Sequence, residues 1–90
     1  MILPCLCCDK KLESSIPNNL NIINQPNNAN IFKSYGHYGS DLFDPMNGEY
    51  LEINICSECL EKCRVKGAIL HITPARHSEP NYKYKLWDYK

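Results

Sequence analysis

The chain lacks any long hydrophobic run. Nothing in its 90 residues approaches the roughly 20 consecutive apolar residues of a membrane span. The first residues, Met1, Ile2 and Leu3, are followed at once by Pro4 and Cys5, without the apolar stretch of about 7 to 15 residues that a secretory signal peptide needs. We therefore expect a cytoplasmic location and no membrane partner. A reducing cytosol favours metal binding over disulfides as the role of paired cysteines.

The common signatures of an active site are also missing. The sequence has no Ser-His-Asp grouping with a nucleophile elbow, no Gly-rich phosphate loop and no thioredoxin-like pattern. His37 invites comparison with the histidine that activates water in some zinc-finger nucleases, but the helix predicted below carries no His or Asn to hold a second metal. We therefore predict that the protein is not an enzyme and that His37 forms a hydrogen bond within its own loop.

Basic residues are absent from the middle of the chain. Residues 40–61 contain six acidic residues and no Lys or Arg, whereas residues 62–90 contain seven basic residues and two acidic ones. The formal net charge of zero therefore hides a strong asymmetry. Such charges often only solvate exposed faces; the alternative is that the basic C-terminal third meets an acidic partner.

Four of the six cysteines form two Cys-x-x-Cys pairs, Cys5 with Cys8 and Cys56 with Cys59. Two such pairs supply the four thiolates of a tetrahedral Zn²⁺ site, and each pair can chelate from one tight turn. A domain of this length buries only about 60% of the surface that its unfolded chain exposes, so its core alone is marginal. Zinc binding to thiolates is worth about 10 to 16 kcal/mol. The sequence thus predicts one structural Zn²⁺ that is required for folding.

Two cysteines remain outside these pairs. Cys63 lies four residues after Cys59, so it shares a helix face with that ligand and is expected to pack as a small apolar residue beside the metal. An alternative ligand and a redox role stay open for it. Cys7 could replace Cys8 as a ligand, but the spacing from Cys5 to Cys8 is preferred because it repeats the spacing of the second pair.

Local patterns predict a single α+β domain over residues 1–90 that begins with a zinc knuckle at residues 1–12. Residues 13–30 contain seven Asn and form a predicted Asn-rich loop. A β-hairpin is predicted next, with strands at residues 40–44 and 49–55 around an Asn-Gly turn. In its second strand the alternation predicts one face toward the core (Leu51, Ile53, Ile55) and one toward water (Tyr50, Glu52, Asn54).

A helix is predicted from Glu58 to about Lys66, because acidic residues come first, basic residues come last and Gly67 follows as a stop. Knuckle, loop, hairpin and a helix that carries the second ligand pair together predict a treble-clef-like zinc finger. Residues 67–72 are a further strand candidate. In the C-terminal extension, residues 74–90, alternating aromatic and basic residues predict either an edge strand or an exposed tail.

Three pieces of the chain resemble a group of small proteins encoded by bacteriophages and prophages. They are the Cys-x-x-Cys-x-Lys-x-Leu motif at residues 5–12, the Gly-x-Tyr-Gly-Ser-x-x-Phe-Asp-Pro-x-Asn-Gly motif at residues 36–48, and residues 51–60 around the second cysteine pair. The resemblance implies a zinc-binding protein with its ligands at Cys5, Cys8, Cys56 and Cys59. It implies no settled activity.

A binding module is the interpretation that remains. A protein partner is favoured because the total charge is balanced, because the acidic hairpin would repel phosphate and because Tyr and Trp are preferred interface anchors. The most concrete form is a phage accessory protein that binds and modulates a host protein. The alternative is a nucleic-acid-binding zinc finger that uses the basic, aromatic C-terminal third. In the protein-binding interpretation the expected contact residues are Tyr82, Lys83, Tyr84, Lys85 and Trp87.

Overall fold

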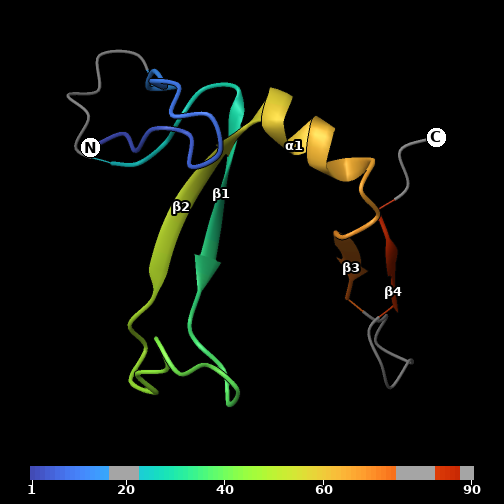
Figure 1. Cartoon of the computed structure of the whole chain (residues 1–90). Helices are drawn as coiled ribbons and strands as arrows, with labels where there is room; N and C mark the ends of the chain where they lie inside the picture. Colours follow the sequence, from blue (N-terminus) through green and yellow to red (C-terminus); the bar gives the residue numbers. More distant parts are fainter. Residues whose placement is uncertain (17–22, 75–82, 88–90) are drawn as a thin grey trace. The chain divides into compact units, whose positions relative to one another are not determined.

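The computed structural model describes residues 1–16, 23–74 and 83–87 and shows a small α+β protein (Figure 1). Its elements, in chain order, are β1 (Ala29–Ser34), β2 (Leu51–Cys56), α1 (Ser57–Arg64), β3 (Leu70–Thr73) and β4 (Lys83–Leu86). β1 and β2 form one antiparallel sheet, and β3 and β4 form another. The chain divides into two compact units, Met1–Ser57 and Glu58–Lys90. The predicted α+β class is confirmed.

The strand that pairs with β2 is β1, which the sequence patterns did not predict. Its register runs from Ala29 opposite Cys56 to Ser34 opposite Leu51. The prediction of a strand at residues 40–44 is wrong, since these residues form bends and irregular backbone. The physical reason lies in composition. Residues 40–44 hold two Asp and lie between a Gly and a Pro, which sheets disfavour, whereas β1 holds Ile31 and Phe32.

Backbone hydrogen bonds connect the start and the end of the Asn-rich segment before β1 begins. Ser15 N donates a hydrogen bond to Gln25 O at 2.8 Å, and Asn27 N donates to Glu13 O at 2.7 Å. Ser14 and Pro26 form an isolated antiparallel bridge. The predicted loop at residues 13–30 is therefore shorter than expected at its end, where Ala29 and Asn30 belong to β1, and residues 17–22 lie outside the described part of the chain.

The two faces of β2 are not divided as the alternation predicted. Asn54, expected to face water, is fully buried, whereas Leu51, expected in the core, is 47% exposed. The reason is that Leu3 and Asn24 lie against the Asn54 side chain, which donates hydrogen bonds to Leu3 O at 2.9 Å and to Asn24 Oδ1 at 2.7 Å. Alternation in a strand indicates that its two faces differ. It does not indicate which face another segment of the chain will cover, because that depends on the tertiary structure.

The helix α1 has eight residues and ends at Arg64, slightly before the predicted end near Lys66. Gly67, the predicted stop, has a φ of +66°, and its N–H donates to Arg64 O at 3.3 Å. A left-handed conformation at the C-terminal end of a helix favours glycine because it has no Cβ. Over the part of the chain that is described, no helix has both the length and the hydropathy to cross a bilayer.

In the C-terminal unit, β3 and β4 form a two-stranded sheet with one apolar face. The register pairs Leu70 with Leu86 and Ile72 with Tyr84, so these four side chains share a face. His71 and Lys85 pair on the opposite face. Of the strand predicted at residues 67–72, only residues 70–72 belong to β3, which continues to Thr73. Within the extension β4 pairs with β3, and residues 75–82 and 88–90 lie outside the described chain.

Candidate metal centre

The first cysteine pair lies in a tight turn at residues 5–10. Asp9 N donates to Cys5 O, and Cys5 N donates to Lys10 O, both at 2.9 Å. Asp9 has a φ of +61°, a conformation that Asp tolerates better than most residues. Leu6 N donates to Asn54 O at 2.9 Å and so holds this turn against β2. The predicted knuckle is present and is fixed by backbone hydrogen bonds.

The second pair lies where β2 passes directly into α1. Cys56 is the last residue of the strand and Cys59 lies in the first turn of the helix. At this junction Ser57 N donates a hydrogen bond at 2.8 Å to the backbone oxygen of Asn28, the residue just before β1. Cys56 is buried and Cys59 is half-buried. The strand therefore fixes the position of the Cys56 sulfur, and the first turn of the helix brings the Cys59 sulfur close to it.

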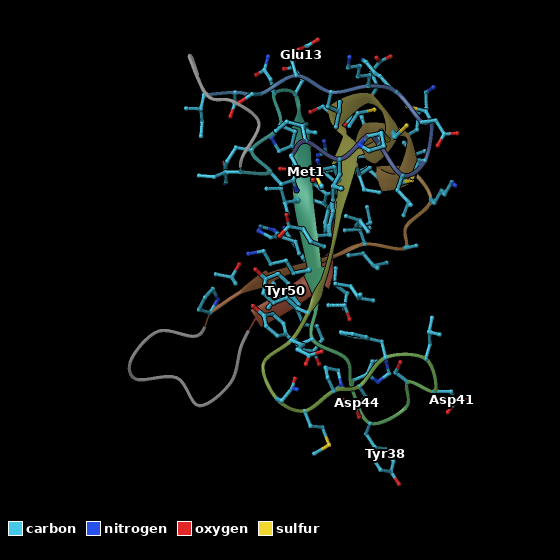
Figure 2. The ribbon with its side chains drawn as sticks, turned by 90° about the vertical axis from the view of Figure 1, so that its left-hand side faces the viewer. Met1, Glu13, Tyr38, Asp41, Asp44 and Tyr50 are labelled. Carbon is cyan, nitrogen blue, oxygen red and sulfur yellow. The ribbon has the colours of Figure 1, made fainter. Side chains whose placement is uncertain are left out.

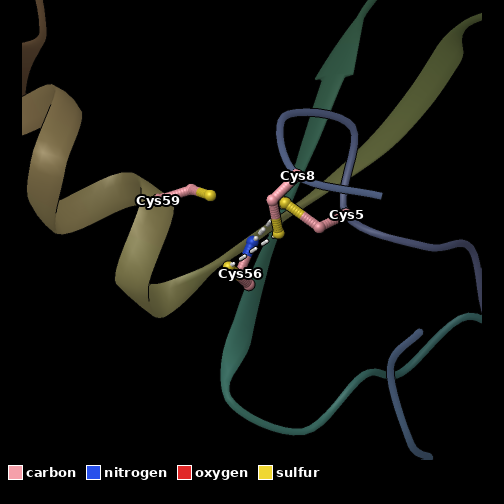
Figure 3. Close-up of side chains that lie close together, drawn as sticks. All are labelled: Cys5, Cys8, Cys56 and Cys59. Atoms are coloured by element: carbon pink, nitrogen blue, oxygen red, sulfur yellow. Dashed lines mark hydrogen bonds between the residues drawn. The ribbon is translucent and has the colours of Figure 1, made fainter. Parts of the chain in front are cut away.

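The structure brings the four predicted ligands together (Figure 3). The Sγ atoms of Cys5, Cys8, Cys56 and Cys59 all lie within 4.8 Å of one another, and the Sγ atoms of Cys8 and Cys56 are 3.9 Å apart. Two thiolates on a tetrahedral metal with bonds of about 2.3 Å are separated by about 3.8 Å, so the spacing fits a single ion. None of the six cysteines forms a disulfide. The cluster is compatible with one structural metal ion.

Backbone N–H groups stabilise the thiolate of Cys5. Cys56 N donates to Cys5 Sγ at 3.3 Å, and this bond is the main reason that the pKa of Cys5 is lowered to about 6. Burial acts in the opposite direction, while the backbone N–H groups of Cys8 and Cys7 lower the pKa further. The thiolate is the form that binds a metal, so these donors favour binding and offset part of the negative charge of the ligand set.

The side-chain amides of Asn24 and Asn54 hydrogen-bond to each other close to the first cysteine pair, an interaction that the sequence patterns did not predict. Asn54 Nδ2 donates to Leu3 O at 2.9 Å and to Asn24 Oδ1 at 2.7 Å. Asn24 Nδ2 returns a bond to Asn54 Oδ1 at 2.9 Å. Among the described residues no buried side-chain polar atom lacks a partner. One feature of the sequence could have indicated this pair: Asn54 lies between two Ile residues in a strand. If that face of the strand is buried, the Asn side chain needs a hydrogen-bond partner.

The remaining residues that the sequence singled out are not members of this group of four. Cys7 is exposed and Cys63 is half-buried, and neither belongs to the group of four. His37 Nδ1 accepts a hydrogen bond from Gly39 N at 3.1 Å, which confirms the predicted bond within the loop. Over the residues that the structure describes, no second group of His, Cys, Asp or Glu side chains has metal-ligating geometry.

The predicted contact residues of the C-terminal extension are only partly described. Tyr84 and Lys85 are exposed on β4, and the Trp87 side chain is half-buried. The Arg64 guanidinium carbon lies 4.5 Å from the centre of the Trp87 ring, and Trp87 N donates to Ile69 O at 2.7 Å. Lys83 begins β4, and Tyr82 lies outside the described residues.

Comparisons with known proteins identify no relative. No family model matches the chain, and no similar curated protein or solved structure was found. The interpretation of the cysteine cluster therefore depends on its own geometry and chemistry.

Proposed function

We propose that this protein is a zinc-stabilised binding module in which a single Zn²⁺ has a structural role. The observation that carries the proposal is the convergence of four cysteine Sγ atoms within 4.8 Å of one another. Thiolates are soft ligands that select Zn²⁺ over Mg²⁺ or Ca²⁺. Four thiolates also close the coordination sphere, which leaves no position for an attacking water. We therefore infer that the protein is not an enzyme.

We also infer a treble-clef arrangement. The first ligand pair comes from a knuckle that is hydrogen-bonded to β2, and the second comes from the junction of β2 with α1. This order of knuckle, sheet and helix is the one that the fold requires. The strand that completes the sheet is β1 (Ala29–Ser34), which replaces the predicted strand at residues 40–44.

The proposed partner is a protein, and the proposed surface lies on β4. Tyr84 is 68% exposed and Lys85 is exposed beside it. In the described chain β4 pairs only with β3, so the other edge of β4 offers its backbone groups to a strand of another protein. With the phage resemblance, the concrete form is a phage accessory protein that binds a host protein in the cytoplasm, with no membrane partner.

Nucleic acid is the second candidate, because His71 and Lys85 place basic side chains on one face of the β3–β4 sheet. It is less well supported for two reasons. The Trp87 ring, one of the expected stacking platforms, is already in contact with the Arg64 guanidinium. Asp41, Asp44 and Glu49 are exposed on the same chain and would repel phosphate.

Three measurements test the proposal. Metal analysis of the purified protein should give one equivalent of zinc, and far less zinc in a folded sample would overturn the structural role.

A host protein captured from lysate should then bind the purified chain directly. Binding should be lost in Lys85→Glu and kept in Lys11→Glu, which makes the same charge change at an exposed residue of the N-terminal unit. Retention on DNA that falls steeply with salt would favour nucleic acid instead.

A further inference from the structure

The loop between β1 and β2, residues 35–50, is held in one shape by its own hydrogen bonds. Ser40 N donates to His37 O at 2.9 Å, and Phe43 N donates to Ser40 Oγ at 3.1 Å. Gly36 has a φ of +84°, and a Cβ placed on it would lie 2.5 Å from Phe43 O. The backbone at the start of the loop therefore contacts the backbone near residue 43, and only glycine fits this approach.

Aromatic residues close the base of this loop. The rings of Tyr35 and Tyr50 lie with their centres 5.0 Å apart, and Lys33 Nζ lies 4.9 Å from the centre of the Tyr50 ring. Near the second end, Asn47 Oδ1 accepts a hydrogen bond from Glu49 N at 3.1 Å. The loop has no regular secondary structure, but these contacts order it before any partner arrives, which lowers the entropic cost of binding.

This ordered loop presents large apolar side chains to solvent. Tyr38 is fully exposed and extends away from the loop (Figure 2), Leu42 is 93% exposed and Met46 is 87% exposed. No described residue of the N-terminal unit covers these three side chains. A loop that is fixed by its own contacts and yet exposes apolar groups is typical of a recognition element.

The charge on the loop specifies what it can bind. Asp41, Asp44 and Glu49 are exposed, and no Lys or Arg occurs between Lys33 and Lys62. Phosphate and anionic lipid headgroups would be repelled. A suitable surface must instead carry cationic groups, so that it can meet the carboxylates.

A groove with a cationic side chain in its lining lies on the β3–β4 sheet. It has a volume of about 310 Å³ and is lined by His71, Thr73, Tyr84 and Lys85. His71 and Lys85 are paired in the register, so they project side by side from one face of the sheet. The groove thus offers the cationic side chain of Lys85 for a loop carboxylate, while the Tyr84 side chain belongs to the other face of the sheet.

We propose that the loop at residues 35–50 of one copy docks into the His71–Lys85 groove of a second copy, in a head-to-tail contact. The formal net charge of zero removes the overall repulsion that would keep copies apart, while acidic and basic residues are concentrated in different parts of the chain. The contact is heterologous, so each copy has one loop and one groove to offer. It does not depend on the partner proposed above, but a partner bound at β4 would compete with it.

Sedimentation velocity of the zinc-loaded protein over a range of concentrations tests this proposal. We expect reversible association that rises with concentration and weakens as salt is added, because charges at the contact are screened. Asp41→Lys should weaken association at least about fivefold, since it places like charges together. Glu13→Lys makes the same charge change at an exposed residue outside the loop and should have little effect.

The groove is tested in the same way, with Lys85→Glu against Lys11→Glu. The decisive experiment mixes the two disabled proteins. The Asp41→Lys protein has a basic loop, which can dock into the acidic groove of the Lys85→Glu protein. The Lys85→Glu protein keeps a native loop, which can dock into the native groove of the Asp41→Lys protein. The mixture should therefore associate, whereas each protein alone should not. A wild-type protein that stays monomeric at every concentration, or a mixture that shows no recovery, would overturn the proposal. Circular dichroism and zinc content establish that each variant is folded.

Discussion

The side-chain amides of Asn24 and Asn54 hydrogen-bond to each other in both directions, at 2.7 and 2.9 Å. Asn54 is fully buried and its backbone holds the knuckle through Leu6 N. Asn24 Oδ1 also accepts a hydrogen bond from Leu3 N at 3.2 Å. The pair therefore connects the Asn-rich segment, the N-terminus and the strand that ends at Cys56.

Asn54→Leu is expected to destabilise the protein by about 1 to 3 kcal/mol, because it removes the two hydrogen bonds between the amides and the donor to the Leu3 carbonyl. Asn30→Leu is the matched control. It makes the same change at an exposed residue of β1 and should stay within about 0.5 kcal/mol. Chemical unfolding of both variants with zinc present measures the difference. Equal stability of the two variants would show that the amide pair does not stabilise the fold.

Replacement of a ligand and of a neighbouring cysteine on the same helix should give opposite results. Cys59→Ala removes one of four thiolates and is expected to lose zinc and unfold the N-terminal unit. Cys63→Ala, four residues along the helix, should keep one equivalent of zinc and cost about 1 kcal/mol. Zinc content and circular dichroism distinguish the two. Equal loss of metal from both variants would contradict the assignment of Cys63 as a packing residue.

The metal should be retained at neutral pH and released in acid. The pKa of Cys5 in the folded protein is about 6, below the ordinary value of 9.0 for a cysteine thiol. Because the folded state favours the thiolate, its stabilisation is complete above the unfolded value and is lost as the pH falls through about 6. Metal binding also competes with protons for the same sulfurs. Zinc release into a coloured chelator during acid titration measures this, and release already under mildly alkaline conditions would contradict it.

The parts of the fold that follow from local chemistry were predictable from the sequence. The Cys-x-x-Cys spacing located all four members of the cluster, and Gly67 located the end of α1 to within three residues. The strand β2 was found by its alternation. These signals need no knowledge of distant residues, because a tight turn, a helix end and a pleated strand each have their own sequence requirements.

The parts that depend on distant contacts were not predictable. The strand β1 follows an Asn-rich segment, so its composition conceals it, and the local pattern favours an acidic segment with an Asn-Gly turn as the partner of β2 instead. The burial of Asn54 was missed because a period of two does not identify the face that another segment covers. Asn24, its partner, lies 30 residues away in the sequence, and no local pattern connects the two.

In the C-terminal unit, the contact between Arg64 and Trp87 should stabilise the packing of the chain after β4 against the helix. The guanidinium carbon lies 4.5 Å from the ring centre, and such a contact is worth about 0.5 to 1 kcal/mol when partly exposed. Arg64→Met keeps the aliphatic stem and removes the charge, so it should lower the stability of this unit by about that amount. Trp87 is the only tryptophan, so its fluorescence reports on this unit specifically. Lys62→Met, on the same helix, removes the same charge as the control. Identical tryptophan emission and identical unfolding in the two variants would show that the contact contributes nothing.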